Sequence, residues 1–156
     1  MIKKMLGLLL WVFTFQLVGF LIGRMTQLNI VTWYQTLNKS TFNPPEIVFP
    51  IVWSILYIMI AVAGWYLWQK RNEPRAKLAL VFYAIQVVMN WLWTPIFFQL
   101  HMIQLGFYWI IGIITFNFIT ILISGKHYKL TTIMLVPYLF WLMFAGYLNW
   151  SIWMNN

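Results

Sequence analysis

Long apolar runs separated by short polar segments make up most of the sequence. A helix needs about 20 apolar residues to cross a bilayer. Residues 78–125 carry no formal charge and are too long for one crossing, so we divide them at the polar residues around His101. The predicted spans are residues 5–23, 47–68, 78–100, 102–124 and 130–153. The pattern predicts an all-α membrane protein, a five-transmembrane-helix bundle that forms a single domain over residues 1–156.

The segment between the first two spans, residues 25–46, is the one long polar connection. Connections of this length are usually functional or disordered. Apolar residues recur in it at helical spacing: Ile30, Trp33, Tyr34 and Leu37. We therefore expect a long, partly helical first loop, with a short amphipathic helix lying on the membrane surface.

Prolines mark the start and the interior of several spans. In Asn43-Pro44-Pro45-Glu46, Asn43 suits an N-cap, Pro44 the first helical position and Glu46 a capping box, which predicts that the second span starts here. Three further prolines lie inside predicted spans and either kink their helices or serve packing alone: Pro50, Pro95 and Pro137.

The composition agrees with a membrane protein and sets its orientation. The chain is 63% hydrophobic and 8% charged, whereas about a quarter of the residues of a soluble domain are charged. The net charge of +8 does not indicate nucleic-acid binding, because the basic residues flank the apolar runs. Eight of them fall on one side of the bundle: Lys3, Lys4, Lys70, Arg71, Arg75, Lys77, Lys126 and Lys129. Only Arg24 and Lys39 fall on the other, which predicts a multi-pass cell-membrane protein with a cytoplasmic N-terminus and an outer first loop and C-terminus.

Several kinds of chemistry have no candidate residues. The sequence contains no cysteine, so disulfides and thiolate sites are excluded. Glu46 and Glu73 are the only carboxylates and fall on opposite sides, which leaves no acid–base pair. His101 and His127 also fall on opposite sides, so we expect no metal site. No catalytic residue is assigned; Trp53 and Trp141 are the only candidates, and only if the protein proves to be a tryptophan-dependent enzyme.

Three predicted spans place large aromatic residues at a similar depth. A rise of about 1.5 Å per residue puts Trp53, Trp93 and Trp141 all roughly 10–18 Å below the outer surface. Their rings suit stacking on a flat apolar ligand. Asn90 offers a hydrogen-bonding group at this depth, and Ala145 leaves space. For any single tryptophan, interfacial anchoring or packing is the favoured explanation. The shared depth of Trp53, Trp93 and Trp141 together favours a site.

Small residues form two further patterns. Gly19 and Gly23 form a close-approach motif in the first span, and alanines line one face of the third. Either pattern serves packing within the chain or a dimer contact.

The ordered motifs resemble the TspO/MBR family of tryptophan-rich membrane proteins, which includes the peripheral benzodiazepine receptor. The resemblance rests on Trp33-Tyr34, Phe42-Asn43-Pro44-Pro45, Val52-Trp53 with Tyr57, Asn90-Trp91, and Pro137-Tyr138 followed by Trp141, Ala145 and Leu148-Asn149. It implies a five-helix bundle, commonly homodimeric, with a pocket beneath the first loop. It also implies ligands such as protoporphyrin IX, sterols, and benzodiazepine- or isoquinoline-type drugs, with no required cofactor.

By this resemblance the ligand-binding residues would be Tyr34, Pro44, Trp53, Asn90, Trp93, Trp141 and Ala145. We further expect the propionates of a bound porphyrin to lie toward Lys39 or Arg24 at the outer rim. The sequence departs from the family at Lys39-Ser40-Thr41-Phe42, where Lys-Pro-x-Trp is usual. No basic residue follows Tyr147, which weakens the case for a sterol-recognition pattern.

We therefore expect a membrane receptor or carrier that binds porphyrins in a tryptophan-lined pocket. The alternatives are a tryptophan-dependent, light-assisted enzyme that degrades protoporphyrin IX, and a regulatory accessory membrane protein.

Overall fold

The computed structural model describes residues 2–156, apart from the side chain of Leu28. Five long helices account for most of them: α1 (Ile2–Thr32), α2 (Val48–Gln69), α3 (Pro74–Thr94), α4 (Ile103–Ser124) and α5 (Lys129–Asn155). Two short helical segments lie between them, the 3₁₀ turn η1 (Tyr34–Thr36) and the π-helical turn η2 (Pro95–Gln99). All five long helices are long and apolar enough to cross a membrane. The predicted all-α fold with five spanning helices is confirmed.

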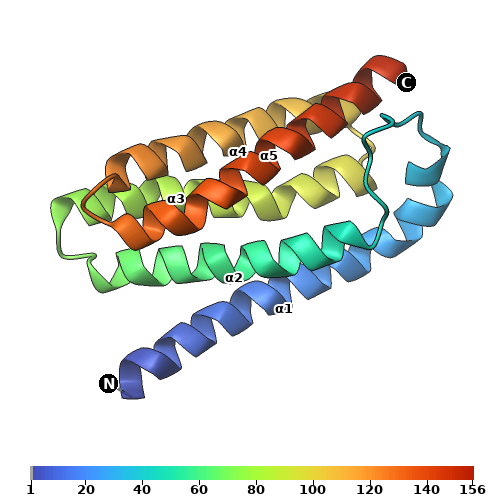
Figure 1. The fold of residues 1–156 in the computed structure, drawn as a ribbon. Coiled ribbons are helices and arrows are strands. Elements are labelled where there is room, and N and C mark those ends of the chain that lie inside the picture. The colour runs from blue at the N-terminus through green and yellow to red at the C-terminus, as the bar shows by residue number, and fades with distance from the viewer. Residues whose placement is uncertain (1) are drawn as a thin grey trace.

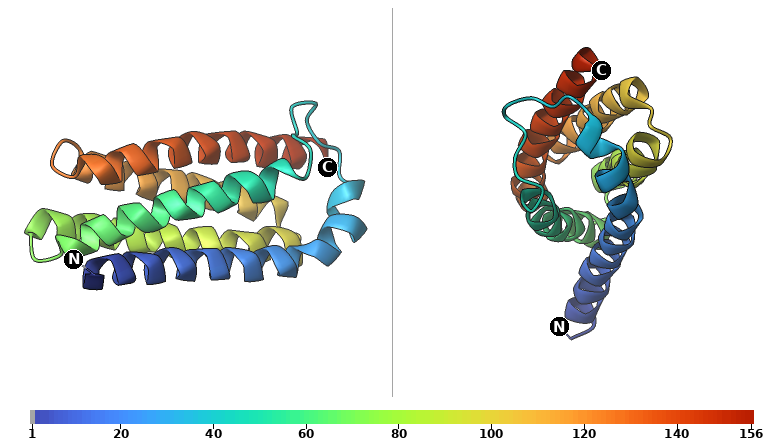
Figure 2. Two further views of the ribbon diagram at one scale, coloured as in Figure 1. Left: turned by 60° about the horizontal axis from the view of Figure 1, so that its bottom comes forward. Right: turned by 90° about the vertical axis from the view of Figure 1, so that its right-hand side faces the viewer.

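The helices run side by side along the long axis of the molecule (Figures 1 and 2). The most extensive packing joins α3 to α4 and α4 to α5, while α1 packs mainly on α2. The N-terminal part of α1 leans away from the bundle (Figure 1). The first loop (residues 37–47) and the C-terminus lie at one end, which we call the loop end. The α2–α3 and α4–α5 connections lie at the other, which we call the basic end because it carries most of the lysines and arginines.

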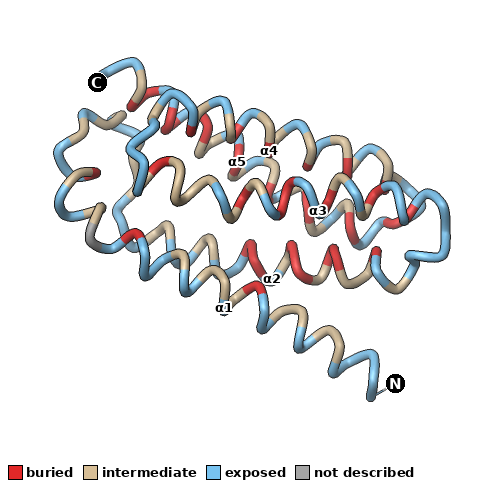
Figure 3. The backbone as a smooth tube through the Cα atoms, turned by 180° about the vertical axis from the view of Figure 1, so that it is seen from behind, coloured by how far each residue is buried: buried red, intermediate tan, exposed pale blue. Residues whose placement is uncertain are grey.

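Buried residues lie on the inward faces of the helices, and exposed residues lie around the outside (Figure 3). Many of the exposed residues are large and apolar; Phe20 is 64% exposed and Phe140 is 65% exposed. A soluble protein rarely exposes contiguous apolar surface on this scale. The outer surface of the bundle is therefore suited to contact with lipid tails.

The structure corrects the prediction of a separate amphipathic helix in the first loop. α1 instead continues without a break to Thr32, and the Trp33 amide donates to the carbonyl of Asn29. Nothing in residues 24–32 stops a helix, since the segment contains neither proline nor glycine. Tyr34 packs inward against Phe97 and Ile152 instead of lying on the membrane surface.

The structure also corrects the predicted start of α2, which begins at Val48 and not at Pro44. The residue before a proline is disfavoured in helical conformation, so Pro44 cannot enter a helix ahead of Pro45. Asn43 Oδ1 accepts a hydrogen bond from the Tyr34 hydroxyl, and Asn43 Nδ2 donates to the Pro44 carbonyl. The Glu46 carboxylate accepts from the Gln35 side chain. Neither Asn43 nor Glu46 caps α2.

The three internal prolines have different effects. Pro50 falls in the first turn of α2, where an amide is not needed, so it does not interrupt the helix. Pro95 begins the π-helical turn, in which the Leu100 amide donates to the Pro95 carbonyl at 3.0 Å. Pro137 lies within α5.

Glycines allow close contacts between helices. A methyl group added at Gly19 would lie 2.5 Å from the Tyr57 ring, and one added at Gly64 would overlap the Tyr83 ring. A methyl group at Gly23 would meet nothing within 4 Å. Gly19 therefore serves packing within the chain, as one of the two sequence readings proposed.

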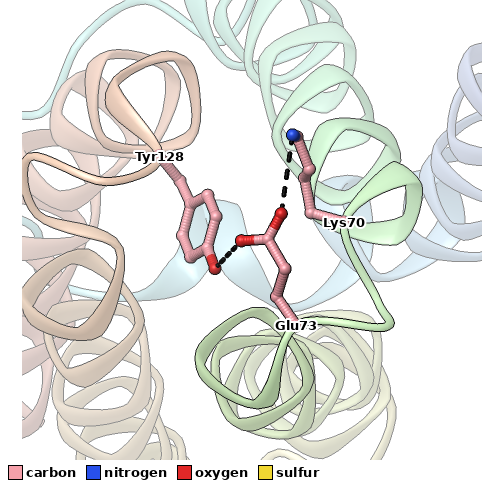
Figure 4. Close-up of polar contacts among 3 residues, drawn as sticks. All are labelled: Lys70, Glu73 and Tyr128. Carbon is pink, nitrogen blue, oxygen red and sulfur yellow. Dashed lines mark hydrogen bonds and ion pairs between the residues drawn. The ribbon is translucent and has the colours of Figure 1, made fainter.

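A polar cluster ties the helix connections together at the basic end. The Tyr128 hydroxyl donates to the Glu73 carboxylate at 2.7 Å, and the Lys70 ammonium lies 3.5 Å from the other carboxylate oxygen (Figure 4). Tyr128 is buried, whereas the Glu73 side chain is half exposed. The hydrogen bond from Tyr128 and the nearby Lys70 charge lower the pKa of Glu73.

The Tyr128→Phe substitution is expected to raise the pKa of Glu73 toward its ordinary value. Because the folded-state pKa is lowered, the stabilisation from this contact is present above the ordinary glutamate pKa and is lost as pH falls through the lowered value. Carboxyl ¹³C NMR titration measures this directly, since Glu46 is the only other acidic residue and serves as an internal control. An unchanged titration of Glu73 in the variant would show that the contact does not form.

Candidate functional site

A hydrogen-bonded triad joins three helices in the middle of the bundle. The Tyr57 hydroxyl of α2 donates to Asn90 Oδ1 at 3.2 Å, and Asn90 Nδ2 of α3 donates to the Tyr138 hydroxyl of α5 at 3.0 Å. All three side chains are buried. The Trp53 ring lies against Tyr57 and Tyr138, with centroid distances of 5.5 and 6.3 Å. Two of the predicted residues, Trp53 and Asn90, therefore belong to one contact network.

Trp93 lies in a separate aromatic cluster between α3 and α4. Its ring stacks on Phe97 at 5.0 Å with an interplanar angle of 12°. Its indole N–H donates to the Gly106 carbonyl at 3.1 Å. Trp33 and Tyr34, from the segment that precedes the first loop, also contact Phe97 edge-on. Trp93 thus helps to join the end of α3 to α4 and to η1.

Trp141 lines an open apolar groove of about 380 Å³ between α2 and α5. The groove is bordered by Val52, Ile55, Leu56, Met59, Pro137, Phe140, Trp141 and Phe144. Trp141 also contacts Phe49, one turn before Trp53 on α2, at 6.1 Å. The indole nitrogen of Trp141 is buried and has no hydrogen-bond partner among the described residues. The side chains that border the groove therefore present an apolar wall.

The structure places the three predicted tryptophans against one core but not around one cavity. All three pack on the same cluster of buried residues. Trp141 lines the α2–α5 groove, whereas Trp53 and Trp93 are not among the residues that border it. Ala145 and Pro44 are each half-buried, and Tyr34 is buried. The ligand-binding role of these residues stays a prediction.

The first loop is fastened to the end of α5. The Asn38 amide donates to Asn156 Oδ1 at 2.9 Å, and the Asn156 carboxamide donates back to the Asn38 carbonyl at 3.1 Å. The Ser40 and Tyr147 hydroxyls are 3.1 Å apart, and the Phe42 ring lies edge-on to Tyr147. These contacts are exposed hydrogen bonds and one aromatic ring pair, so separating the first loop from α5 costs little free energy.

The two predicted rim cations are placed differently. The Lys39 ammonium donates to the carbonyls of Tyr34 and Leu37 at 2.7 and 3.1 Å and lies 4.8 Å from the centre of the Tyr34 ring. Burial raises the pKa of Tyr34 to about 12, so its hydroxyl stays protonated and donates to Asn43. Arg24, in contrast, is exposed on α1. Lys39 thus already holds the shape of the segment before the first loop.

Replacing Lys39 with methionine is expected to loosen residues 34–47 while leaving the bundle folded. The substitution keeps the length of the side chain but removes the donor to several backbone carbonyls. Amide hydrogen exchange in residues 34–47 should become faster, with little change in the melting temperature. Arg24→Met is the matched control and should leave exchange in the loop unchanged. Equal exchange in the two variants would contradict the role given to Lys39.

Three residues near the predicted site belong to the motifs of the resemblance but were not predicted as site residues. Tyr57 and Tyr138 complete the triad, and the spacing of Tyr57 one turn after Trp53 was the available signal. Asn149 on α5 is 2% exposed, and neither its oxygen nor its nitrogen has a partner among the described residues. A methyl group at Gly106 would lie 3.3 Å from Asn149 Nδ2, so this amide lies close to the carbonyl that Trp93 uses.

Comparisons with known proteins identify relatives along nearly the whole chain. The model of the TspO/MBR family matches residues 11–154. The tryptophan-rich protein TspO of Chlorobaculum tepidum is 35% identical over 157 residues, covering 96% of each chain. Protein CrtK of Rhodobacter capsulatus is 37% identical, covering 80% of this chain and 78% of its own. The human translocator protein is 29% identical, covering 80% of this chain and 75% of its own.

Proposed function

Because the chain belongs to the TspO/MBR family, we propose that it binds flat, apolar tetrapyrroles such as protoporphyrin IX at the α2–α5 groove and beneath the first loop. The groove beside Trp141 is the observation that carries this proposal. Its volume of about 380 Å³ falls within the range of about 300–1,000 Å³ that is usual for small-molecule sites. Its walls are apolar, which suits an apolar ligand.

The aromatic residues around the groove favour a planar ligand over a flexible one. Phe140 and Phe144 border the groove together with Trp141, and the Phe144 ring lies 5.6 Å from the Trp141 ring, so a ring system that enters the groove meets several aromatic side chains. Offset and edge-on ring contacts add about 0.5–1.5 kcal/mol each beyond the area that they bury. The first loop is held to α5 by the hydrogen bond between Ser40 and Tyr147, one helical turn beyond Phe144 of the groove. The loop is thus placed to cover the groove and to open when this bond breaks.

The ionised groups of a porphyrin need a counter-charge at the rim. We propose Arg24 for this role before Lys39, because the Lys39 ammonium already donates to backbone carbonyls. We further propose, from the distribution of basic residues, that the loop end faces outward and the basic end faces the cytoplasm. The homodimer implied by the resemblance also stays a proposal.

The Trp141→Phe variant is expected to bind protoporphyrin IX about threefold to tenfold more weakly than the wild type. The estimate corresponds to the loss of one aromatic contact, since such a contact adds about 0.5–1.5 kcal/mol and 1.4 kcal/mol is tenfold in affinity. Quenching of tryptophan fluorescence in nanodiscs measures the affinity.

Trp68→Phe is the matched control, because Trp68 is 42% exposed near the basic end and lies beside Arg71. It should bind as the wild type does. Equal affinity in the two variants would exclude the groove as the site.

Light-assisted degradation of protoporphyrin IX is the second candidate. The contact of the Trp53 ring with Tyr57 and Tyr138 favours it, because adjacent oxidisable rings provide a path for an electron toward a photoexcited ligand, which is reduced as a ring is oxidised. Product formed over many turnovers in the dark would indicate an enzyme. One event per protein that requires light would reduce the reaction to photochemistry of the bound ligand.

A further inference from the structure

Three of the fully buried polar side chains between the triad and the basic end have polar atoms without a hydrogen-bond partner among the described residues. Gln86 on α3, Asn117 on α4 and Ser124 on α4 are each 0% exposed. Neither amide atom of Gln86 has a hydrogen-bond partner among the described residues, and the same holds for Asn117 Oδ1 and Ser124 Oγ. Among the described residues, the Asn117 side chain makes one long hydrogen bond, 3.4 Å from Nδ2 to the Leu135 carbonyl.

These side chains follow one another along the inward faces of two packed helices. Gln86 lies one turn from Asn90 on the same face of α3, and both are buried. Asn117 and Ser124 are seven residues apart, which puts them on one face of α4, with buried Thr120 between them.

The register of α3 against α4 places the row in order. The Phe82 and Phe116 rings stack at 6.1 Å, and the Trp109 indole donates to the Met89 carbonyl at 2.8 Å. In this antiparallel register Gln86 is nearer the triad, Asn117 is nearer the basic end, and Ser124 is nearer still. Polar groups thus step from the triad toward the basic end at intervals of about one to two helical turns.

The row ends at the polar cluster of the basic end. The Ser124 carbonyl accepts the amide hydrogens of His127 and Tyr128. The Tyr128 hydroxyl in turn donates to Glu73, whose side chain is 50% exposed (Figure 4). One end of the row is therefore the Asn90 triad, and the other reaches an exposed carboxylate.

We propose that this row binds internal water molecules, which connect the Tyr57–Asn90–Tyr138 triad to the aqueous side at the basic end. Buried polar groups are almost always hydrogen-bonded, to protein or to ordered water. An amide whose oxygen and nitrogen both need partners requires a ligand that donates and accepts, and water does both. The row has no charged side chain to balance an ion, since Gln86, Asn117, Thr120 and Ser124 are neutral, whereas water needs no counter-charge. The proposal does not depend on porphyrin binding.

Ligand-free protein in nanodiscs tests the proposal through the side-chain amide of Gln86. Its ¹⁵N–¹H resonances are assigned by their loss in the Gln86→Leu variant. We expect cross-relaxation with water and side-chain exchange with D₂O that is faster than exchange of the buried Val87 backbone amide. A Gln86 side chain without water cross-peaks, and as protected as Val87, would overturn the proposal.

Blocking the row near the basic end should slow the exchange. Ser124→Leu is expected to slow exchange of the Gln86 side chain at least about tenfold, as an apolar plug replaces a polar step. Ser54→Leu is the matched control, because Ser54 is exposed on α2 in the half near the loop end, and it should leave exchange unchanged.

Asn117→Leu is nearly isosteric and serves as the second plug if Ser124→Leu does not fold. Unchanged exchange of the Gln86 side chain in whichever plugged variant folds would exclude a connection to the basic end.

Discussion

Gly64→Ala is expected to destabilise the protein by about 2 kcal/mol or more, although the same substitution in a helix normally stabilises it. Alanine has the higher helix propensity by about 1 kcal/mol. At Gly64, however, the new methyl group overlaps the Tyr83 ring. Tyr83 is 4% exposed, and its hydroxyl donates to the Ile60 carbonyl at 2.8 Å, so the ring cannot move without losing this bond. Overpacking of this kind costs about 1–3 kcal/mol, and the lost hydrogen bond adds to it.

Gly23→Ala is the control for this prediction. A methyl group there meets nothing within 4 Å, so only the gain in helix propensity should remain. Thermal unfolding in a mild detergent should show a lower melting temperature for Gly64→Ala and an equal or higher one for Gly23→Ala. If the two variants melt together, the close contact of α2 with α3 does not exist as described.

Asn90→Leu is expected to cost about 2–4 kcal/mol, because it leaves two buried hydroxyls without their partner. Asn90 accepts from Tyr57 and donates to Tyr138. A buried polar group that loses its partner costs about 1–3 kcal/mol. The replacement is close in volume, so little of the loss comes from packing.

A double-mutant cycle separates the hydrogen bonds from other effects. Tyr57→Phe in the Asn90→Leu background should cost less than Tyr57→Phe alone, since its partner is already gone. Thr115→Val is the control, because the Thr115 hydroxyl is exposed and bonds only within its own helix at Ile111. Additive losses at Tyr57 and Asn90 would exclude the triad as a coupled unit.

The number of spans was predictable because charge marks the borders of a membrane, but charge does not mark the ends of helices. The first span was predicted as residues 5–23, since Arg24 ends the uncharged run. The helix has 31 residues and passes Arg24 to Thr32. Arginine is a good helix former, so the chain leaves the apolar layer without leaving the helix.

The sequence predicts how deep the site tryptophans lie in the membrane, but it does not predict the direction in which their side chains point. Counting residues places Trp53, Trp93 and Trp141 at one level, yet each residue turns a helix by about 100°. Trp53 faces the triad, Trp93 faces α4, and Trp141 borders the α2–α5 groove. Side-chain direction depends on which helices are neighbours, and a single sequence does not state that. Asn149 was missed for the same reason, since only packing shows that its amide is buried.

The π-helical turn at Pro95 has a consequence for how the two ends of α3 behave. A turn of this kind inserts one extra residue, so the side chains beyond it are out of phase with those before it by about 100°. The body of α3 packs against α2 and α4, while Phe97 beyond the turn contacts Trp33 and Tyr34. The tip of α3 therefore packs with η1 ahead of the first loop, whereas the body of the helix, which carries both Asn90 and Trp93, keeps its own contacts with α2 and α4.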